Sequence, residues 1–127
     1  MNQATFEPDS SSVRAVRSFV ASATDLPEAL EATVSLLASE LASNSVLHAR
    51  TPFQVSINTG FGRVRVSVTD SSPRLPVMKL HSLEAATGRG LRLVQSLADR
   101  WGVESEEPGK TVWFEFDLVD PGVARSA

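Results

Sequence analysis

The sequence predicts an α+β fold, a two-layer sandwich in which helices cover one face of a mainly antiparallel, mixed sheet. Two observations support this class. Two segments with apolar residues at helical spacing come first along the chain. Two pairs of segments with alternating apolar residues follow, separated by a loop and one more helical segment. The resulting order is helix, helix, hairpin, loop, helix, hairpin, which places the helices together on one side of the sheet.

Apolar residues that recur every three or four positions predict three helices. These helices extend over about residues 12–23, 25–48 and 91–101. Asp25 is a candidate cap for the second helix, and Pro27 suits its first turn. Gly102 is the expected stop of the third helix.

Alternation of apolar and polar residues predicts four strands, over about residues 53–57, 64–68, 103–105 and 111–118. Gly60 to Arg63 is the expected turn of the first hairpin, and Pro108 to Lys110 is the expected turn of the second. The rest of the chain is assigned to a loose leader (1–5), a short edge strand (6–8), a loop (71–87) and a frayed tail (120–127).

Length and composition indicate one domain over residues 1–127, with a core over about residues 6–118. A net charge of -3 without a sustained basic patch argues against direct binding of nucleic acid. The absence of cysteine excludes disulfides, thiolate metal sites and a cysteine nucleophile. The N-terminus lacks signal-peptide features, and no apolar run approaches the roughly 18 residues of a membrane span. A cytoplasmic protein without membrane contact is therefore expected.

Glu40, Asn44 and His48 are each four residues apart in the second predicted helix, so they rise along one side of it. This polar line borders the apolar stripe of the helix and can face a cleft between helix and sheet. Two interpretations are open. The line is either a polar helix flank, or a pair in which the Asn44 amide oxygen coordinates Mg²⁺ while the Glu40 carboxylate orients or deprotonates a nucleophile.

Asp70 continues the line of Val64, Val66 and Val68 toward the core side of a predicted strand. A carboxylate in that position is costly unless it has a partner. The exocyclic amine of a nucleotide base is one candidate partner. The alternative is that Asp70 caps the turn formed by residues 71–73.

Gly88-Arg89-Gly90 is expected just before the third helix, where glycines let backbone N–H groups approach a phosphate. The alternative is a flexible helix entry. Two common nucleotide motifs are excluded, because a dinucleotide fingerprint requires glycine at Leu93 and a P-loop requires glycine at Glu104. Lys110 is then a turn residue, and Thr111 opens the last strand.

Taken together and in order, four segments resemble the motifs of the Bergerat-fold, or histidine-kinase-like, ATPases. Glu40–His48 is similar to their N-box, and Val68–Ser72, Gly88–Leu91 and Gly109–Val112 are similar to their three glycine-box positions. The resemblance covers about Val13 to Leu118. The short form is similar to the anti-sigma-factor serine/threonine kinase branch, and especially to small ATP-binding regulators of actinobacteria.

The resemblance implies roles for individual residues. Glu40 matches the general base, and Asn44 matches the Mg²⁺ ligand. Asp70 matches the acceptor for the adenine amine, and Thr111 matches a threonine that holds adenine through water. The implied ATP-binding residues are Asn44, Asp70, Ser72, Gly88, Arg89, Gly90, Leu91 and Thr111.

The resemblance also implies a function in transcription regulation. Such a protein captures a sigma factor and phosphorylates an anti-anti-sigma (STAS-type) protein with Mg-ATP, commonly as a homodimer. Two departures from the family pattern support an alternative, a non-catalytic ATP-binding interaction module. Ser72 stands where the family usually has glycine, and the lid segment from Ser72 to Gly88 is short.

Overall fold

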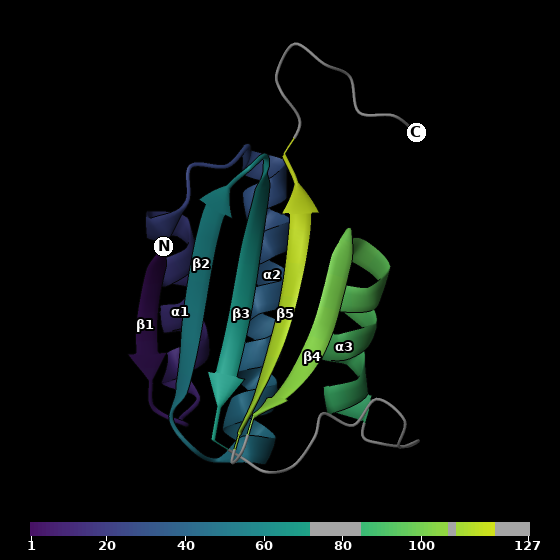
Figure 1. The fold of residues 1–127 in the computed structure, drawn as a ribbon. Coiled ribbons are helices and arrows are strands. Elements are labelled where there is room, and N and C mark those ends of the chain that lie inside the picture. The colour runs from purple at the N-terminus through teal and green to yellow at the C-terminus, as the bar shows by residue number, and fades with distance from the viewer. Residues whose placement is uncertain (72–84, 107–108, 119–127) are drawn as a thin grey trace.

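The computed structural model describes residues 1–71, 85–106 and 109–118 of the chain (Figure 1). The elements in chain order are β1 (Asn2–Phe6), α1 (Ser11–Ala23), α2 (Glu28–Asn44), η1 (Ser45–Ala49), β2 (Phe53–Gly60), β3 (Arg63–Asp70), α3 (Ala85–Leu97), β4 (Arg100–Glu106) and β5 (Gly109–Asp117).

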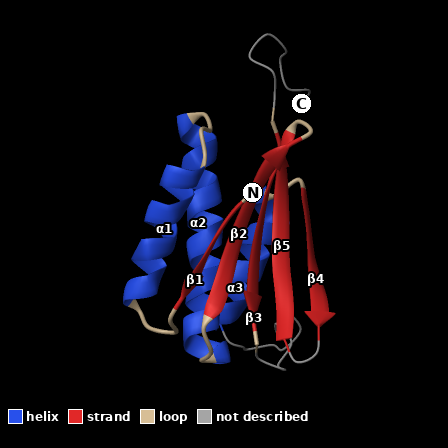
Figure 2. Cartoon of the chain, turned by 60° about the vertical axis from the view of Figure 1, so that its left-hand side comes forward, coloured by secondary structure: helices blue, strands red, loops and turns tan. Residues whose placement is uncertain are grey.

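The five strands form one sheet in the order β1-β2-β3-β5-β4, and each neighbouring pair is antiparallel. Figure 2 shows α1, α2 and α3 on the same side of this sheet. The predicted two-layer α+β fold is therefore confirmed, with antiparallel pairing throughout the described strands. No helix among the described residues is long and apolar enough to cross a membrane.

The core lies between the sheet and the helices. Successive side chains of a strand point to opposite faces, so every second residue of β2, β3 and β5 reaches the helices. The buried apolar residues of the core are Val16, Val20, Val34, Leu37, Ala38, Leu41, Ala42, Phe53, Val55, Ile57, Val64, Val66, Val68, Leu91, Val94, Val112, Phe114 and Phe116.

The N-terminal segment is ordered in β1, so the prediction of a loose leader was wrong. Asn2–Phe6 pairs along its whole length with β2. Phe6 stacks on Phe53 at 5.6 Å between ring centroids and meets the edge of Phe19 at 6.0 Å. The short segment carries too little alternation to be recognised as a strand, and its order comes from pairing with β2 and from these ring contacts.

The second helix begins and ends differently from the prediction. Its N-cap is Pro27, without a side-chain cap bond, so the proposed capping by Asp25 was wrong. Helical structure reaches Ala49, close to the predicted end, but residues 45–49 form a π-helical turn. Arg50 closes this turn in the left-handed region at φ 56°, and its N–H donates to the Ser45 carbonyl at 3.0 Å.

The third helix begins at Ala85, six residues before its predicted start. It ends at Leu97, four residues before its predicted end. Trp101 and Gly102 belong instead to β4, so the predicted stop at Gly102 was wrong. Trp101 faces Phe114 of β5 in the sheet register. A helical period and an alternating period both fit these few residues, and pairing with β5 decides between them.

The predicted hairpin turn between β2 and β3 is confirmed. Gly60 pairs with Arg63, and the two residues between them, Phe61 and Gly62, have φ values of 54° and 75°. Two consecutive positive φ values are those of a type I′ turn, whose twist matches the flanking strands. Phe61 is fully exposed, so its ring contributes no burial to compensate for its left-handed backbone.

Replacing Phe61 with asparagine should therefore stabilise the protein by about 1 kcal/mol, because asparagine tolerates this conformation better than phenylalanine. Thermal unfolding of the two proteins measures the difference. Phe61→Val is the opposing control, since a β-branched residue suits positive φ least. Equal stability of all three proteins would show that the turn conformation does not limit stability.

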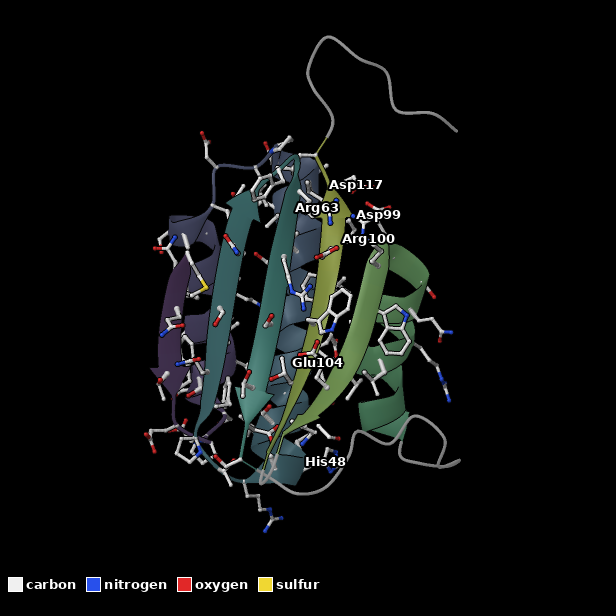
Figure 3. The ribbon with its side chains drawn as sticks, viewed as in Figure 1. His48, Arg63, Asp99, Arg100, Glu104 and Asp117 are labelled. Atoms are coloured by element: carbon white, nitrogen blue, oxygen red, sulfur yellow. The ribbon has the colours of Figure 1, made fainter. Side chains whose placement is uncertain are left out.

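The face of the sheet away from the helices carries a network of charges around Glu115. This side chain is only 7% exposed and is held by Arg100 at 2.7 Å and by Arg65 at 3.1 Å. The hydrogen bond from Arg100 is the main cause that lowers the pKa of Glu115. Figure 3 shows Arg63, Arg100 and Asp117 together at one end of the sheet, with His48 at the opposite end.

Candidate functional site

Glu40 and Asn44 lie one turn apart at the C-terminal end of α2, and both are partly buried. The regular α-helix ends at Asn44, and the wider η1 turn follows directly. His48 therefore does not continue the line of the two preceding residues at α-helical spacing. Its side chain is exposed. π-Helical turns are frequent at functional sites, where they redirect the residues beside them.

Gly90 packs directly against this pair. A Cβ atom at Gly90 would lie 3.0 Å from Asn44 Nδ2 and 3.5 Å from the Glu40 Cβ. Glycine is therefore the residue that lets α3 approach α2 at Glu40 and Asn44. The structure thus brings Glu40 and Asn44 of one predicted motif together with Gly90 of another.

The position of Gly88-Arg89-Gly90 within α3 corrects the expectation of a turn before the helix. Because α3 begins at Ala85, Gly88 lies in its first turn and Gly90 lies beyond it. Only the first four N–H groups of a helix lack an intrahelical acceptor, so Gly90 is not among the free donors. The observed role of Gly90 is close helix packing, while the first turn retains donors suited to an anion.

Asp70 ends β3 on the helix side of the sheet, in line with Val68, and is buried. Lys110 is a partner of this carboxylate, and its Nζ donates to both carboxylate oxygens at 3.0 Å. The two residues are directly opposed in the β3–β5 register. Lys110 is thus part of β5 and 12% exposed, so its assignment to a turn was wrong.

Gly109 allows β5 to start beside Asp70. A Cβ atom there would lie 2.0 Å from the Asp70 carbonyl oxygen and 3.1 Å from the Ser71 Cα. Since these are backbone atoms, no side-chain rotation can relieve the overlap. Gly109 therefore permits the close spacing of the two strands where Lys110 meets Asp70.

Thr111 does not lie on the same face as Asp70. It opposes Thr69, and the two hydroxyl oxygens are 2.8 Å apart. Thr69 alternates with Asp70 along β3, so this hydroxyl pair faces away from the helices. The structure therefore separates Thr111 from the residues with which it was grouped.

Two further residues of the predicted ATP-binding set have different outcomes. Leu91 is 1% exposed, and its side chain packs in the core of the protein. Ser72 and most of the predicted lid, residues 72–84, lie outside the described residues.

Sequence reasoning missed Lys110 as the partner of Asp70. A signal was available, because Lys110 precedes Val112 and Phe114 by two and four positions. The alternation of a strand places such a residue on the core side, beside the carboxylate of the neighbouring strand.

The donor set at the end of α2 suits a hard cation that also has phosphate ligands. The Glu40 carboxylate and the Asn44 amide offer oxygen atoms, which Mg²⁺ prefers, and Mg²⁺ usually takes only one or two protein ligands. No group of three or more His, Cys, Asp or Glu side chains suited to a metal occurs among the described residues. The Asn44 amide oxygen therefore suits a metal that a nucleotide brings with it, with the Glu40 carboxylate close by.

These elements meet at one end of the molecule. Figures 1 and 2 agree in placing the C-terminal ends of α2 and β3 beside the start of β5, with the start of α3 at the same end. The site thus combines two oxygen-bearing side chains, the first turn of a helix and a buried carboxylate. Such an arrangement can hold phosphates at one side and a polar heterocycle at the other.

Comparison with known proteins shows the family to which this fold belongs. The family model described as histidine kinase-like ATPase domain matches residues 6–116. A crystal structure of the RsbU and RsbW domains of Rv1364c from Mycobacterium tuberculosis is similar, with a TM-score of 0.67 and 17% identity. The match covers 95% of this chain and 34% of that one, so this chain spans about a third of the length of the chain it matches. No curated protein gave a significant match. The match over residues 6–116 shows that the chain belongs to the histidine kinase-like ATPase domain family.

Proposed function

We propose that the chain binds ATP with Mg²⁺ at the end of α2. The observation that carries this proposal is the packing of Gly90 on Glu40 and Asn44, at the same end of the fold as the buried Asp70. Family membership supports ATP as the nucleotide. In this assignment Asp70 accepts the exocyclic amine of adenine, and the first turn of α3 donates backbone N–H groups to the phosphates.

We further propose that the protein is a serine/threonine protein kinase that captures a sigma factor and phosphorylates an anti-anti-sigma protein of the STAS type. Resemblance to the anti-sigma kinase branch supports this assignment, as does the similarity to a structure that includes an RsbW domain. Capture of the sigma factor depends on the surface of the folded domain, and homodimer formation belongs to the same proposal.

The chemistry assigns one role to each residue near the phosphates. Mg²⁺, when bound with ATP, neutralises charge that develops on the phosphate oxygens. Asn44 offers its amide oxygen to the metal. Glu40 accepts the proton of a partner's serine or threonine hydroxyl as that oxygen bonds to the γ-phosphorus. The bond from phosphorus to the bridging oxygen breaks, and ADP leaves.

A non-catalytic ATP-binding module is the second candidate. One observation favours it: the carboxylate proposed to bind adenine is already paired with Lys110. A module of this kind binds its partner in a nucleotide-dependent manner and transfers no phosphate.

Calorimetric titration with ATP, with and without Mg²⁺, tests binding, and transfer of radiolabelled phosphate to STAS-type proteins tests the kinase assignment. Absence of adenine nucleotide binding would reject both candidates. Binding without transfer to any cognate partner would leave the module as the function.

Replacing Asn44 with alanine should weaken Mg-ATP binding by about tenfold or more and leave metal-free binding nearly unchanged. The reason is that Mg²⁺ relies on few protein ligands, so each contributes strongly. Asn58→Ala, the same substitution in β2, is the matched control and should behave as wild type. If ATP affinity falls equally with and without Mg²⁺, Asn44 is not a metal ligand and is only a polar residue on the flank of the helix.

A further inference from the structure

Lys110 and Asp70 form a nearly closed pair in the nucleotide-free protein. The ammonium lies 3.0 Å from each carboxylate oxygen, and the side chains of Lys110 and Asp70 are 12% and 4% exposed. Their direct opposition in the β3–β5 register holds the two backbones side by side, and Gly109 permits the close approach of the strands at this point. Only side-chain rotation can therefore change the pair.

This pair competes with the ligand assigned to Asp70, an argument that rests on the proposed function. Adenine recognition requires an Asp70 oxygen that can accept an N–H from the base. A carboxylate has several lone pairs, yet both oxygens are engaged by Lys110 and almost none of the side chain is accessible. A base can reach the carboxylate only if the ammonium withdraws.

The sheet provides a place for the withdrawn ammonium. Lys110 lies between Asp70 on β3 and Ser105 on β4, which is its other cross-strand neighbour. Ser105 is exposed on the outermost strand of the sheet. Rotation toward Ser105 gives the ammonium a hydroxyl acceptor and water, and it releases both Asp70 oxygens from Lys110.

We propose that Lys110 is a latch that sets nucleotide affinity at this site. In the closed state it neutralises Asp70, and in the open state it exposes the carboxylate to the base. The observed affinity is then the intrinsic affinity multiplied by the fraction of molecules in the open state. Lys110 also stabilises the Asp70 carboxylate in the empty site, because burying a negative charge is costly and a nearby ammonium offsets that cost.

The test uses Lys110→Met, which keeps an unbranched side chain of similar length and removes the charge. The ligands are adenosine and ADP, because adenosine reports on the base without phosphates. Removing the competing ammonium should raise affinity for both ligands by at least about tenfold, and should lower the unfolding temperature of the ligand-free protein. Lys110→Gln retains a weaker hydrogen-bond donor, so its ligand affinity and its unfolding temperature should lie between those of wild type and Lys110→Met. It also serves as the test variant if Lys110→Met does not fold.

Arg63→Met is the matched control for the loss of a positive charge. It lies at the other end of β3, about 23 Å from Asp70 along the strand, and should leave adenosine affinity unchanged. If wild type binds adenosine and both Lys110 variants bind it equally well or more weakly, the latch is overturned while the proposed nucleotide site stands. A gain for adenosine together with a loss for ADP would also overturn it, since Lys110 would then serve the phosphates. Absence of binding to all proteins would reject the proposed nucleotide site itself.

Discussion

Replacing Glu40 with glutamine is expected to leave ATP affinity close to wild type and to lower phosphate transfer by about 10²- to 10⁴-fold, the usual contribution of a general base. Glutamine has nearly the same shape, so the contact with Gly90 is kept. Its amide cannot take the proton of the attacking hydroxyl. The measurements are calorimetric ATP binding, labelled transfer to a STAS-type protein and, without any partner, the slow hydrolysis of ATP.

The matched control is Glu28→Gln, in the first turn of the same helix and about 18 Å from Glu40 along its axis. It should retain full transfer. Capture of the sigma factor should survive in both variants, because binding requires surface rather than chemistry. A fully active Glu40→Gln protein would keep the kinase and exclude Glu40 as its base.

Replacing Asp70 with asparagine is expected to weaken ATP binding by about 10- to 100-fold, the value of a hydrogen bond to a charged acceptor. The sharper expectation concerns base discrimination. Wild type should prefer ATP to inosine triphosphate, which lacks the exocyclic amine, because a site built for that donor rejects an analogue without it. The Asp70→Asn protein should lose most of this preference. Competition titrations with the two nucleotides measure it.

The same substitution should also lower the free energy of unfolding by about 1–3 kcal/mol, since Lys110 loses its charged acceptor inside the protein. Asp117→Asn is the matched control: its carboxylate also pairs with a cation but is 49% exposed, so little stability should be lost. Nucleotide affinity and discrimination should also remain those of wild type. If Asp70→Asn binds both nucleotides as wild type does, the assignment of the adenine site is wrong.

Local sequence patterns determined much of this fold. The apolar spacing of α1 and α2, the alternation in β2 and β3 and the glycine turn between them were all recognisable, because each depends on residues a few positions apart. The same holds for Glu40 and Asn44, whose spacing of one helical turn places them together on any regular helix. Both predicted ends of α3 were wrong: Gly88-Arg89-Gly90 was placed before the helix, and helical and alternating periods overlap over the few residues at its C-terminal end.

Only the tertiary structure decided how distant segments combine. β1 is a strand because it pairs with β2, and Gly90 allows the close packing of α3 on α2 at Asn44. The partner of Asp70 lies 40 residues away in the sequence, and the register of β3 with β5 selects Lys110 and turns Thr111 to the other face. A shift of one residue in that register would exchange the two. Register depends on the packing of both sheet faces at once, and no local pattern contains that information.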